Sequence, residues 1–589
     1  MATELTTPPL TEHPVNPSGN PRSTHRRGPG RGGAADDETQ SQQVHNSDAG
    51  LSTPRITGAQ VTRLIIGVIW LGFSQQWFFE PLRTPAPGLT LLAGAIGMVT
   101  ILSALLVRGD RWEQRLDIGL LAGSLLFLLL YVVAATYSTF ASDEVAFGQQ
   151  AAVFLLHGHD PYTASYATTF HTYGVSYGTP TLGGGKVTQL SYPAASFLLL
   201  VPFVLLLGAH SYAYIGAVYL GVAASVWMLA RSLPRQVWPA FALLFILPPV
   251  QSLLLNDLDF LYLPFLIASY RWLDSFQDPA HNGVARWLSP LLLGAACSVK
   301  QNPWFLVPFV LVMAVMIARS RGQNPWTVGA RYAGAVALAF LAINLPFIIW
   351  SPSGWVAGTL HPLITAAVPW GIGFGTLLLL WGTGSYAWFG LAGVIAWVAA
   401  LLFYLRFYSR LWMLGPLLAV LPLLFTNRNP AQYFTVAPFL CVFVGAVLRV
   451  PPPPMVRGRR TLSLAAVVAG CAAVAISVAG LAMPSPLSVR VLSASATTDS
   501  FTATVGVMNR GTRAMAPHFI VTVGVIPDEP ATVMSGPARI RPGTRAVYVI
   551  RAAEMSGMPS RGSTTTFEID ATTASPNTFV SSPVATYTG

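Results

Sequence analysis

The sequence predicts a mainly α-helical, polytopic membrane protein of about 13 spans with a C-terminal β-sandwich outside the membrane. Of the 589 residues, 53% are hydrophobic and only 10% are charged, and the mean hydropathy is +0.53. Multi-spanning membrane proteins have this composition. Apolar runs recur between residues 61 and 482, and a period-two alternation replaces them from about residue 484. These observations divide the chain into three regions.

The first region, residues 1–57, is rich in Pro, Gly, Ser, Thr and charged residues. It has too few aliphatic side chains to bury a core, so we expect it to be disordered. Its arginines predict that it is cytoplasmic, because basic residues flanking spans stay on the cytoplasmic side. The first apolar run begins only after residue 60, so no cleavable signal is expected.

The second region, residues 58–482, is expected to form the membrane domain. Many of its apolar runs are shorter than the roughly 20 residues that a straight span needs, which predicts some half-spans facing protein or a cavity. The runs that we expect to form helices cover residues 61–79, 87–107, 117–137, 193–208, 211–230, 236–251, 256–272, 286–299, 303–318, 328–350, 385–405, 411–425, 430–449 and 461–482.

Arginines between these runs predict the topology. Counting crossings from each end gives results that differ by one, somewhere between residues 193 and 230, so one segment there is re-entrant or 193–230 crosses once. Either solution places the polar interruptions on one non-cytoplasmic side of the plasma membrane. They cover residues 138–192, 351–384, 426–430 and 483–589.

The third region, residues 483–589, is expected to form a small antiparallel β-sandwich. Turn residues such as Asn509-Arg510-Gly511 and Pro542-Gly543 separate its strands. The apolar residues expected to face its core alternate at Leu487/Val489/Val491, Phe501/Ala503/Val505/Val507, Phe519/Val521/Val523, Val547/Val549 and Phe567/Ile569.

Composition and motifs exclude several function classes. The net charge of +11 does not indicate nucleic-acid binding, because the arginines form short runs between apolar segments and mark topology. Gly185-Lys186 is not a phosphate loop, since Pro180 stands where its first Gly belongs and Val187 replaces the Ser/Thr. The cysteines show no disulfide or metal-ligand spacing and all lie in apolar runs: Cys297, Cys441 and Cys471.

Two adjacent carboxylates, Asp143 and Glu144, stand at the mouth of a predicted span, ahead of a helix that can lie on the membrane interface. A charge near the hydrocarbon is costly and therefore often functional, although these two could also mark only the polar end of a helix. Lys300 and Arg428 lie at other span ends on the same predicted side. Lys and Arg bind phosphate, and a carboxylate accepts a proton from a hydroxyl group. The set indicates a site for a phosphate-bearing donor and a polar acceptor.

Several motifs then resemble a known family. Asp143-Glu144, His157-Gly158-His159-Asp160-Pro161-Tyr162 and Tyr192-Pro193 resemble the first outer loop of GT-C glycosyltransferases, and Ser298-Val-Lys300-Gln-Asn-Pro303 is similar to a later Lys-x-x-Pro element. The closest resemblance is to polyprenyl-phosphate-dependent mannosyl- and arabinosyltransferases of bacterial envelopes, over residues 117–450. It implies transfer of one mannose or arabinofuranose from a polyprenyl-phosphate donor to an envelope glycan or glycolipid hydroxyl on the outer face.

The resemblance also implies roles for single residues. Asp143 is the expected general base with Glu144 second, and Lys300 and Arg428 are the expected donor-phosphate ligands. The alternative for each is a structural one: ion pairing, turn formation, interfacial anchoring or packing. Further candidates for binding substrate, open to the same alternatives, are His157, His159, Asp160, Tyr162, Tyr192, Asp257, Asp259, Gln301, His361 and Tyr433.

The proposed donor and acceptor also define the partners that this protein should bind. The expected partners are the lipid-linked donor, the acceptor and membrane lipid, with no nucleic acid. No cofactor is certain, and a divalent cation is an open alternative that the sequence does not indicate. The β-sandwich is expected to be a carbohydrate-binding module or a structural spacer.

A transporter or flippase of lipid-linked sugars is the main alternative function, although the polar residues gather at one face of the membrane rather than at its midplane. A ligase for preassembled glycans would favour more outer arginines.

Overall fold

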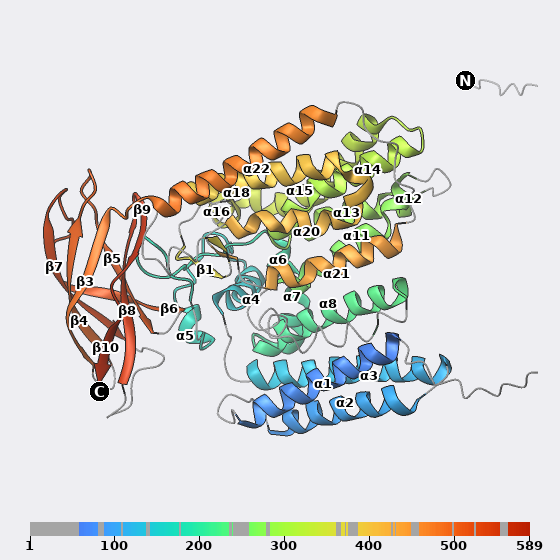
Figure 1. Cartoon of the computed structure of the whole chain (residues 1–589), viewed down its shortest axis with the longest axis horizontal. Coiled ribbons are helices and arrows are strands. Elements are labelled where there is room, and N and C mark those ends of the chain that lie inside the picture. Colours follow the sequence, from blue (N-terminus) through green and yellow to red (C-terminus); the bar gives the residue numbers. More distant parts are fainter. Residues whose placement is uncertain are drawn as a thin grey trace, which may run out of the picture. The chain divides into compact units, whose positions relative to one another are not determined.

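The structure is a computed structural model that describes much of the chain after residue 57 (Figure 1). The predicted cytoplasmic tail, residues 1–57, lies outside the described residues. So do residues 80–86, 108–109, 137–141, 176–177, 235–237, 239–257, 278–282, 361–366, 372, 375–386, 426–427, 430–431, 449–458, 497–499, 524–525, 554–563 and 589.

Helices build the region between residues 58 and 482 (Figure 1). The α-helices are α1 Gly58–Phe79, α2 Pro87–Leu106, α3 Asp110–Thr136, α4 Asp143–Leu156, α5 Thr169–Thr172, α6 Ala195–Leu198, α7 Val201–Leu207, α8 Ser211–Ser232, α11 Asp259–Arg271, α12 Leu273–Gln277, α13 Leu288–Cys297, α14 Val307–Ser320, α15 Pro325–Trp350, α16 Pro352–Thr359, α18 Ala387–Arg406, α19 Tyr408–Leu411, α20 Gly415–Val420, α21 Gln432–Val447 and α22 Arg459–Ala482. Short 3-10 turns are η2 Val284–Trp287, η3 Asn302–Phe305, η5 Trp412–Leu414 and η6 Leu421–Phe425.

Several of these helical segments have the length and composition of membrane spans, as predicted. In the described part of the chain there are seven of them: Arg111–Tyr131, Ser211–Ser232, Asn302–Ser320, Pro325–Trp350, Trp388–Arg406, Tyr408–Phe425 and Arg460–Ala482. Shorter apolar helices cover Gln60–Gly72, Leu91–Leu106, Ala195–Leu207, Val284–Cys297 and Val436–Val447. The membrane-protein class therefore stands, and the number of about 13 crossings remains a prediction.

The chain is irregular where the two topology counts disagree. Two short helices, α6 and α7, occupy the first part of the 193–230 segment, and Gly208 ends them with a φ of +78°. Only glycine takes up that conformation without strain. The long helix α8 follows at once. A broken apolar segment next to a full-length helix is the arrangement expected of a half-span beside a span.

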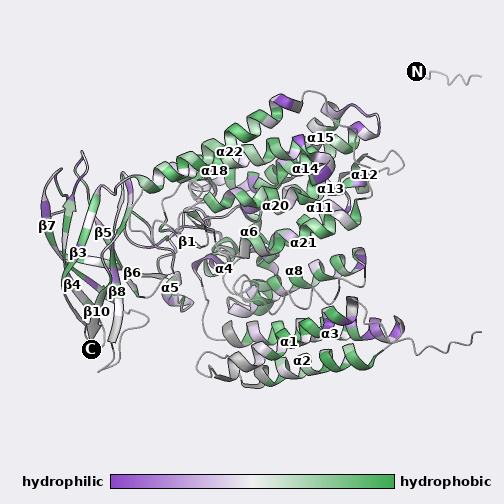
Figure 2. Ribbon diagram, viewed as in Figure 1, coloured by the Kyte–Doolittle hydropathy of each residue, from purple (hydrophilic) through white to green (hydrophobic). Residues whose placement is uncertain are grey.

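Arginines lie at the helix ends remote from the predicted site residues. Helix α11 begins at Asp259 and ends at Arg271, and the antiparallel neighbour α13 follows Arg286 and ends three residues before Lys300. Figure 2 shows long hydrophobic stretches along the helices and hydrophilic residues toward many of their ends. Each of the two helices therefore has an arginine at one end and a predicted site residue, Asp259 or Lys300, at the other.

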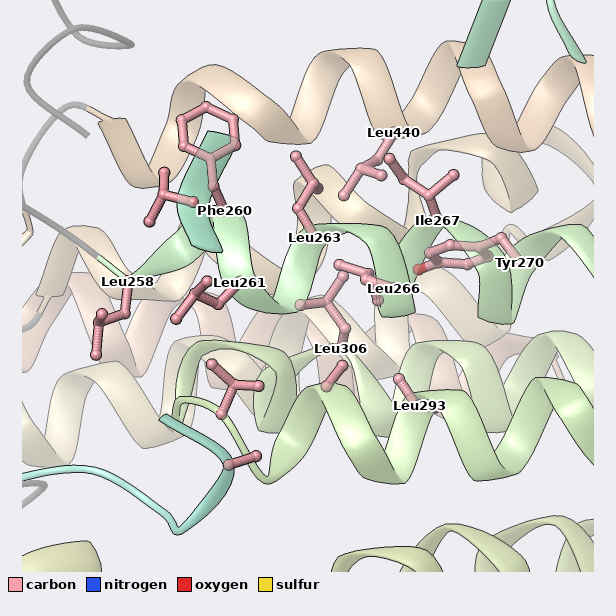
Figure 3. Packing of buried hydrophobic residues seen from close by; sticks show 14 of the residues in the cluster. Leu258, Phe260, Leu261, Leu263, Leu266, Ile267, Tyr270, Leu293, Leu306 and Leu440 are labelled. Atoms are coloured by element: carbon pink, nitrogen blue, oxygen red, sulfur yellow. The ribbon is translucent and has the colours of Figure 1, made fainter. Parts of the chain in front are cut away.

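The main core surrounds α11, which packs against α8, α13 and α21. Ten of its buried residues are labelled in Figure 3, including Leu263, Leu266 and Tyr270 of α11 with Leu293 of α13. Gly221 of α8 sits so close to α11 that an added Cβ would lie 2.3 Å from the Phe260 carbonyl oxygen. Close-packed helices of this kind hold the ends of α11 and α13 in fixed register.

Helices α1, α2 and α3 enclose a smaller core of their own around Trp70 and Phe127. Arg63 of α1 forms two hydrogen bonds of 2.8 Å with Asp117 of α3 and one of 3.1 Å with Glu113. The Arg63–Asp117 pair is buried, and a buried arginine needs such partners because an unpaired charge there costs several kcal/mol.

The C-terminal region is an antiparallel β domain made of one continuous sheet. The strands are β3 Leu487–Ala496, β4 Ser500–Asn509, β5 His518–Val523, β6 Ile526–Ser535, β7 Arg545–Ala553, β8 Thr564–Ala574, β9 Asn577–Ser581 and β10 Ala585–Thr588. Their order is β10-β8-β5-β6-β7-β4-β3, and β9 pairs with β8. Because β6 pairs with both β5 and β7 and β3 lies against β8 and β9, the sheet curls like a barrel around its core. The expected two-sheet sandwich is not established.

The predicted inward face of one strand, β7, is wrong. Val547 is 55% exposed, and the core is filled instead by Tyr548, Ile550 and Ala552. Both sets alternate at period two, and a slip of one residue exchanges the two faces of a strand. Val547 pairs with Gly506 on the outer face, where a β-branched residue is equally acceptable. The other predicted core strands are correct: Leu487, Val489, Phe501, Val505, Phe519, Val521, Phe567 and Ile569 are all buried.

Candidate functional site

Helix α4 carries Asp143 and Glu144 in its first turn. Carboxylates are favoured there because the unpaired amide groups at a helix N-terminus carry partial positive charge. The segment Val145–Gln149 is buried on every side, among α6, α7 and α8. Protein therefore encloses the first half of the helix, and its position on the membrane interface stays a prediction. Such an enclosure fixes the carboxylates more firmly than an interface could.

A buried ion cluster joins three of the predicted residues. Lys300 Nζ lies 2.9 Å from Glu144 Oε1 and 3.0 Å from Asp259 Oδ1. The exposed fractions of the lysine, glutamate and aspartate side chains are 3%, 13% and 5%, respectively. We call Glu144, Asp259 and Lys300 the ion cluster. Its members come from three segments far apart in the sequence.

Local structure explains how these segments meet. Asp259 is the first residue of α11, and the preceding Leu258 amide group donates to Glu144 Oε1 at 2.9 Å. Lys300 follows a turn at the end of α13 in which the Ser298 amide group bonds back to Gly294. The antiparallel pair α11–α13 therefore brings Asp259 and Lys300 to the N-terminus of α4.

Asp143 is held differently from its neighbour. The residue is 7% exposed, and its Oδ2 accepts a hydrogen bond of 2.7 Å from the Thr179 amide group. Thr179 belongs to a small hairpin, residues 179–187, in which Pro180 pairs with Lys186 and the Val187 amide group bonds to Thr179 O. The loop after α4 therefore folds back to contact the first residue of that helix.

The ion cluster and Asp143 together carry three carboxylates and one ammonium group. If all are ionised, the formal charge is negative, which repels a phosphate. The carboxylates of Glu144 and Asp259 therefore oppose the binding of a donor phosphate by Lys300, and displacing one of them or adding a cation nearby would favour it. The expectation that Lys300 attracts the phosphate is therefore incomplete on electrostatic grounds.

Tyr192 and Gln301 flank the cluster. Lys300 Nζ lies 5.6 Å from the centre of the Tyr192 ring, within the range of a cation–π contact. Gln301 Nε2 donates to Ser191 O at 2.9 Å and to Thr359 O at 3.0 Å, so it ties the loop before Tyr192 to the end of α16. In this arrangement Gln301 positions backbone, while Tyr192 presents a ring beside the ammonium group.

Tyr162 is a buried packing residue. Its hydroxyl group donates to Tyr192 O at 3.0 Å, and its ring lies edge-on to Phe197 and Phe347. Burial raises the pKa of the Tyr162 hydroxyl far above its ordinary value, so the group stays protonated. It supports the Tyr192 backbone as a donor.

Asp160 and the two histidines shape the turn after α4. Asp160 Oδ1 accepts from the Tyr162 amide group at 3.0 Å and Oδ2 from Thr163 Oγ1 at 3.1 Å, which is an Asx-type turn. His157 Nδ1 lies 2.8 Å from Val153 O at the end of α4. His159 is exposed and lies edge-on to Phe154. These contacts favour a structural role for all three.

The remaining candidates are only partly described. Arg428 lies in β2, Arg428–Asn429, which pairs in parallel with β1, Trp370–Gly371, so the loops after α16 and before α21 meet. Thr181 of the hairpin pairs in turn with Ala367. Tyr433 lies in α21. The side chains of Arg428 and Tyr433, and the whole of Asp257 and His361, are outside the described residues.

Two residues of the site, Asn344 and Thr179, were not predicted from the sequence. Asn344 is fully buried in α15, where Oδ1 accepts from the Ala194 amide group at 3.0 Å and from Trp355 Nε1 at 3.2 Å. Its Nδ2 group donates to Ser298 Oγ at 3.2 Å and to Phe340 O at 2.9 Å. A lone amide within an apolar span was the available signal. Thr179 had none, because it acts through its backbone.

Within the described residues no group of three or more His, Cys, Asp or Glu side chains is arranged to hold a metal ion. No protein-family model, curated protein or solved structure matches the chain.

Proposed function

We propose that the chain is a membrane glycosyltransferase that moves a single sugar, mannose or arabinofuranose, from a polyprenyl-phosphate donor to a hydroxyl of an envelope glycan or glycolipid. The convergence of Asp143, Glu144, Asp259 and Lys300 in one buried place supports this most directly. Burying four ionisable groups among apolar helices is costly, and function is the usual reason that such a cost is retained.

The geometry supports a division of labour between the two adjacent carboxylates. Glu144 accepts hydrogen bonds from Lys300 and from the Leu258 amide group. These two donors stabilise its ionised form, which makes it a poorer acceptor for a proton. Asp143 accepts a hydrogen bond from the backbone amide group of Thr179 in the hairpin. In the proposed reaction Asp143 takes the proton from the acceptor hydroxyl, while Glu144 and Asp259 hold Lys300 until the donor phosphate draws it away.

Sugar transfer by the purified protein from synthetic polyprenyl-phosphate donors tests the proposal. Asp143→Asn keeps the size and the ability to accept from Thr179 but cannot take a proton, so transfer should fall about 10²–10⁴-fold with donor binding retained. Asp274→Asn, at the opposite helix ends, is the matched control, because the Asp274 side chain is 35% exposed beside Arg321. Normal turnover in Asp143→Asn together with loss of turnover in Glu144→Gln would mean that Glu144, and not Asp143, is the general base.

A transporter or flippase of lipid-linked sugars is the second candidate. A buried lysine between two carboxylates is also an arrangement that ion-coupled transporters use. Reconstitution in vesicles distinguishes the two functions. Movement of a labelled lipid-linked sugar between leaflets with no transfer to any acceptor would favour the transporter. Full transfer by both carboxylate variants would exclude the roles proposed for Asp143 and Glu144.

A further inference from the structure

Part of the outer face of the β domain is buried. On β5, β8 and β9 the core-facing residues are Phe519, Ile569 and Val580. Their neighbours face the opposite side, and they too are buried: Ile520, Thr522, Asp570, Thr572 and Phe579. On the outer face of β3, β4 and β7, by contrast, Leu492 and Val547 are 54% and 55% exposed. One outer face is therefore covered by another part of the chain.

Part of this cover comes from the loop region next to the candidate site, together with Phe389 of α18 and Leu481 of α22. Ile520 and Phe579 form one buried cluster with Leu182 of the hairpin, Val368 and Phe389. At the tip of the hairpin, an added Cβ at Gly183 would lie 3.5 Å from Ala574 Cβ, and one at Gly184 would lie 2.4 Å from His518 Nδ1. At Gly184 the hairpin needs glycine, because the His518 ring leaves no room for a Cβ.

The other end of the same hairpin contacts Asp143. Its first residue, Thr179, donates its amide group to Asp143 Oδ2 at 2.7 Å. Between the two ends the hairpin is rigid, since Thr181 N bonds to Gly185 O at 3.0 Å and Val368 N bonds to Pro180 O at 3.0 Å. A short, hydrogen-bonded element thus connects the β domain to the candidate carboxylate.

We propose that the β domain docks through the outer face of β5, β8 and β9 onto the hairpin 179–187 and thereby positions the Thr179 amide group on Asp143. The docked face is then unavailable for binding a glycan. The catalytic consequence of this positioning rests on the proposed function, whereas the docking itself does not.

Two glycines at the hairpin tip provide a matched test. Gly184 and Gly185 have φ angles of +86° and +71°, so alanine strains the backbone at either position. Only at Gly184 does the new Cβ meet the β domain, whereas at Gly185 no atom lies within 4 Å. The difference between Gly184→Ala and Gly185→Ala therefore isolates the contact with His518.

Hydrogen exchange of the hairpin in the full-length protein gives the first measurement. Gly184→Ala should speed the exchange of the Thr179 region about tenfold more than Gly185→Ala does. His518→Ala, which removes the ring in the way, should restore slow exchange when combined with Gly184→Ala. Equal effects of the two glycine substitutions, or no rescue by His518→Ala, would overturn the proposal.

A disulfide gives the second measurement. Cysteines at Gly183 and Ala574 would place their Cβ atoms within the roughly 3.5–4.5 Å that a disulfide requires. In a chain whose exposed Cys471 is replaced by Ala, the pair should oxidise readily and shift mobility on a non-reducing gel. Failure to form this bond in the folded protein would overturn the docking.

Sugar transfer then decides whether the docking positions Asp143. Gly184→Ala should lower kcat with little change in donor affinity, and Gly184→Ala with His518→Ala should recover turnover. Normal kcat in a Gly184→Ala protein with a loosened hairpin would overturn the positioning role. If the wild-type protein transfers no sugar, the proposed function fails, and exchange and cross-linking still decide the docking.

Discussion

Lys300 Nζ lies 2.9 Å from Glu144 Oε1, and only 3% of the lysine side chain is exposed. With Asp259 on its other side, the ammonium group compensates two buried carboxylates at once. Removing it leaves both without their cation, which costs far more than loss of a surface pair.

Lys300→Met should therefore destabilise the protein strongly, by about 3–5 kcal/mol. Thermal unfolding in detergent, followed by tryptophan fluorescence, measures the change. Lys186→Met is the control, because Lys186 is the other lysine of the sequence and is half-buried over the Phe170 ring. Adding Glu144→Gln and Asp259→Asn to Lys300→Met should recover much of the loss; no recovery would mean that the cluster is not electrostatically coupled.

Asn344 should control the order of the turn that carries Lys300. Asn344→Leu leaves the Ala194 amide group and Trp355 Nε1 without an acceptor, at a cost of about 1–3 kcal/mol for each buried group. Hydrogen exchange of residues 297–303 should quicken. Asn324→Ala, at the N-cap of the same helix, should affect only the start of α15. Equal exchange at 297–303 in both variants would contradict this role of Asn344.

Gly358 should tolerate no side chain. An added Cβ would lie 2.6 Å from Tyr162 Cδ1 and 2.8 Å from Leu190 O, so Gly358→Ala must displace the tyrosine that supports the Tyr192 backbone. Overpacking of this kind costs about 1–3 kcal/mol. Gly334→Ala in α15, where no atom lies within 4 Å, should be neutral or slightly stabilising. The midpoints of thermal unfolding compare the two, and a harmless Gly358→Ala would refute the close packing.

The sidedness of the helix ends can be tested by cysteine labelling. His159 and Thr512 are exposed in segments expected outside the membrane, and Arg321 is exposed at the opposite helix ends. Single cysteines at the first two positions should react with a membrane-impermeant reagent in whole cells, and one at Arg321 only after lysis. Labelling of residues 159 and 321 from the same side would contradict the prediction that the site lies on the opposite side of the membrane from Arg321.

Local pattern accounts for much of this fold. The run expected at 87–107 forms α2 over Pro87–Leu106, and the run expected at 461–482 forms α22 over Arg459–Ala482. Period three to four and period two are properties of single segments, so they can be read from neighbouring residues. The face of β7 could not be read in this way, because two alternations compete in one strand.

The candidate site was predictable as a set of residues but not as a set of contacts. Each of Glu144, Asp259 and Lys300 is conspicuous as a charge beside an apolar run, which is why the sequence singles them out. Their pairing depends on how α4, α11 and α13 pack, and no short-range pattern encodes that. The Thr179 contact depends on a backbone amide group, which every residue except proline offers.

The last prediction concerns Asp570, which is buried in the β domain. Burial raises the pKa of its carboxyl group to about 7, against the hydrogen bond that it accepts from Thr522 Oγ1. The ordinary value is 3.8, so between about pH 4 and pH 7 the folded state binds a proton that the unfolded state has released. Stability should therefore fall as pH rises through this range, by on the order of 4 kcal/mol at most.

Asp570→Asn stays neutral at every pH and keeps the size of the side chain, so it should be more stable than the wild-type domain at about pH 8 and similar to it at about pH 5. Burial also raises the pKa of Glu568, which adds to the same trend, and lowers the pKa of His518, which opposes it near pH 6. Hydrogen exchange of β5 and β8 peptides in the full-length protein, corrected for intrinsic rates, measures the difference. If the two proteins change in parallel from pH 5 to pH 8, Asp570 ionises normally and its burial carries no pH dependence.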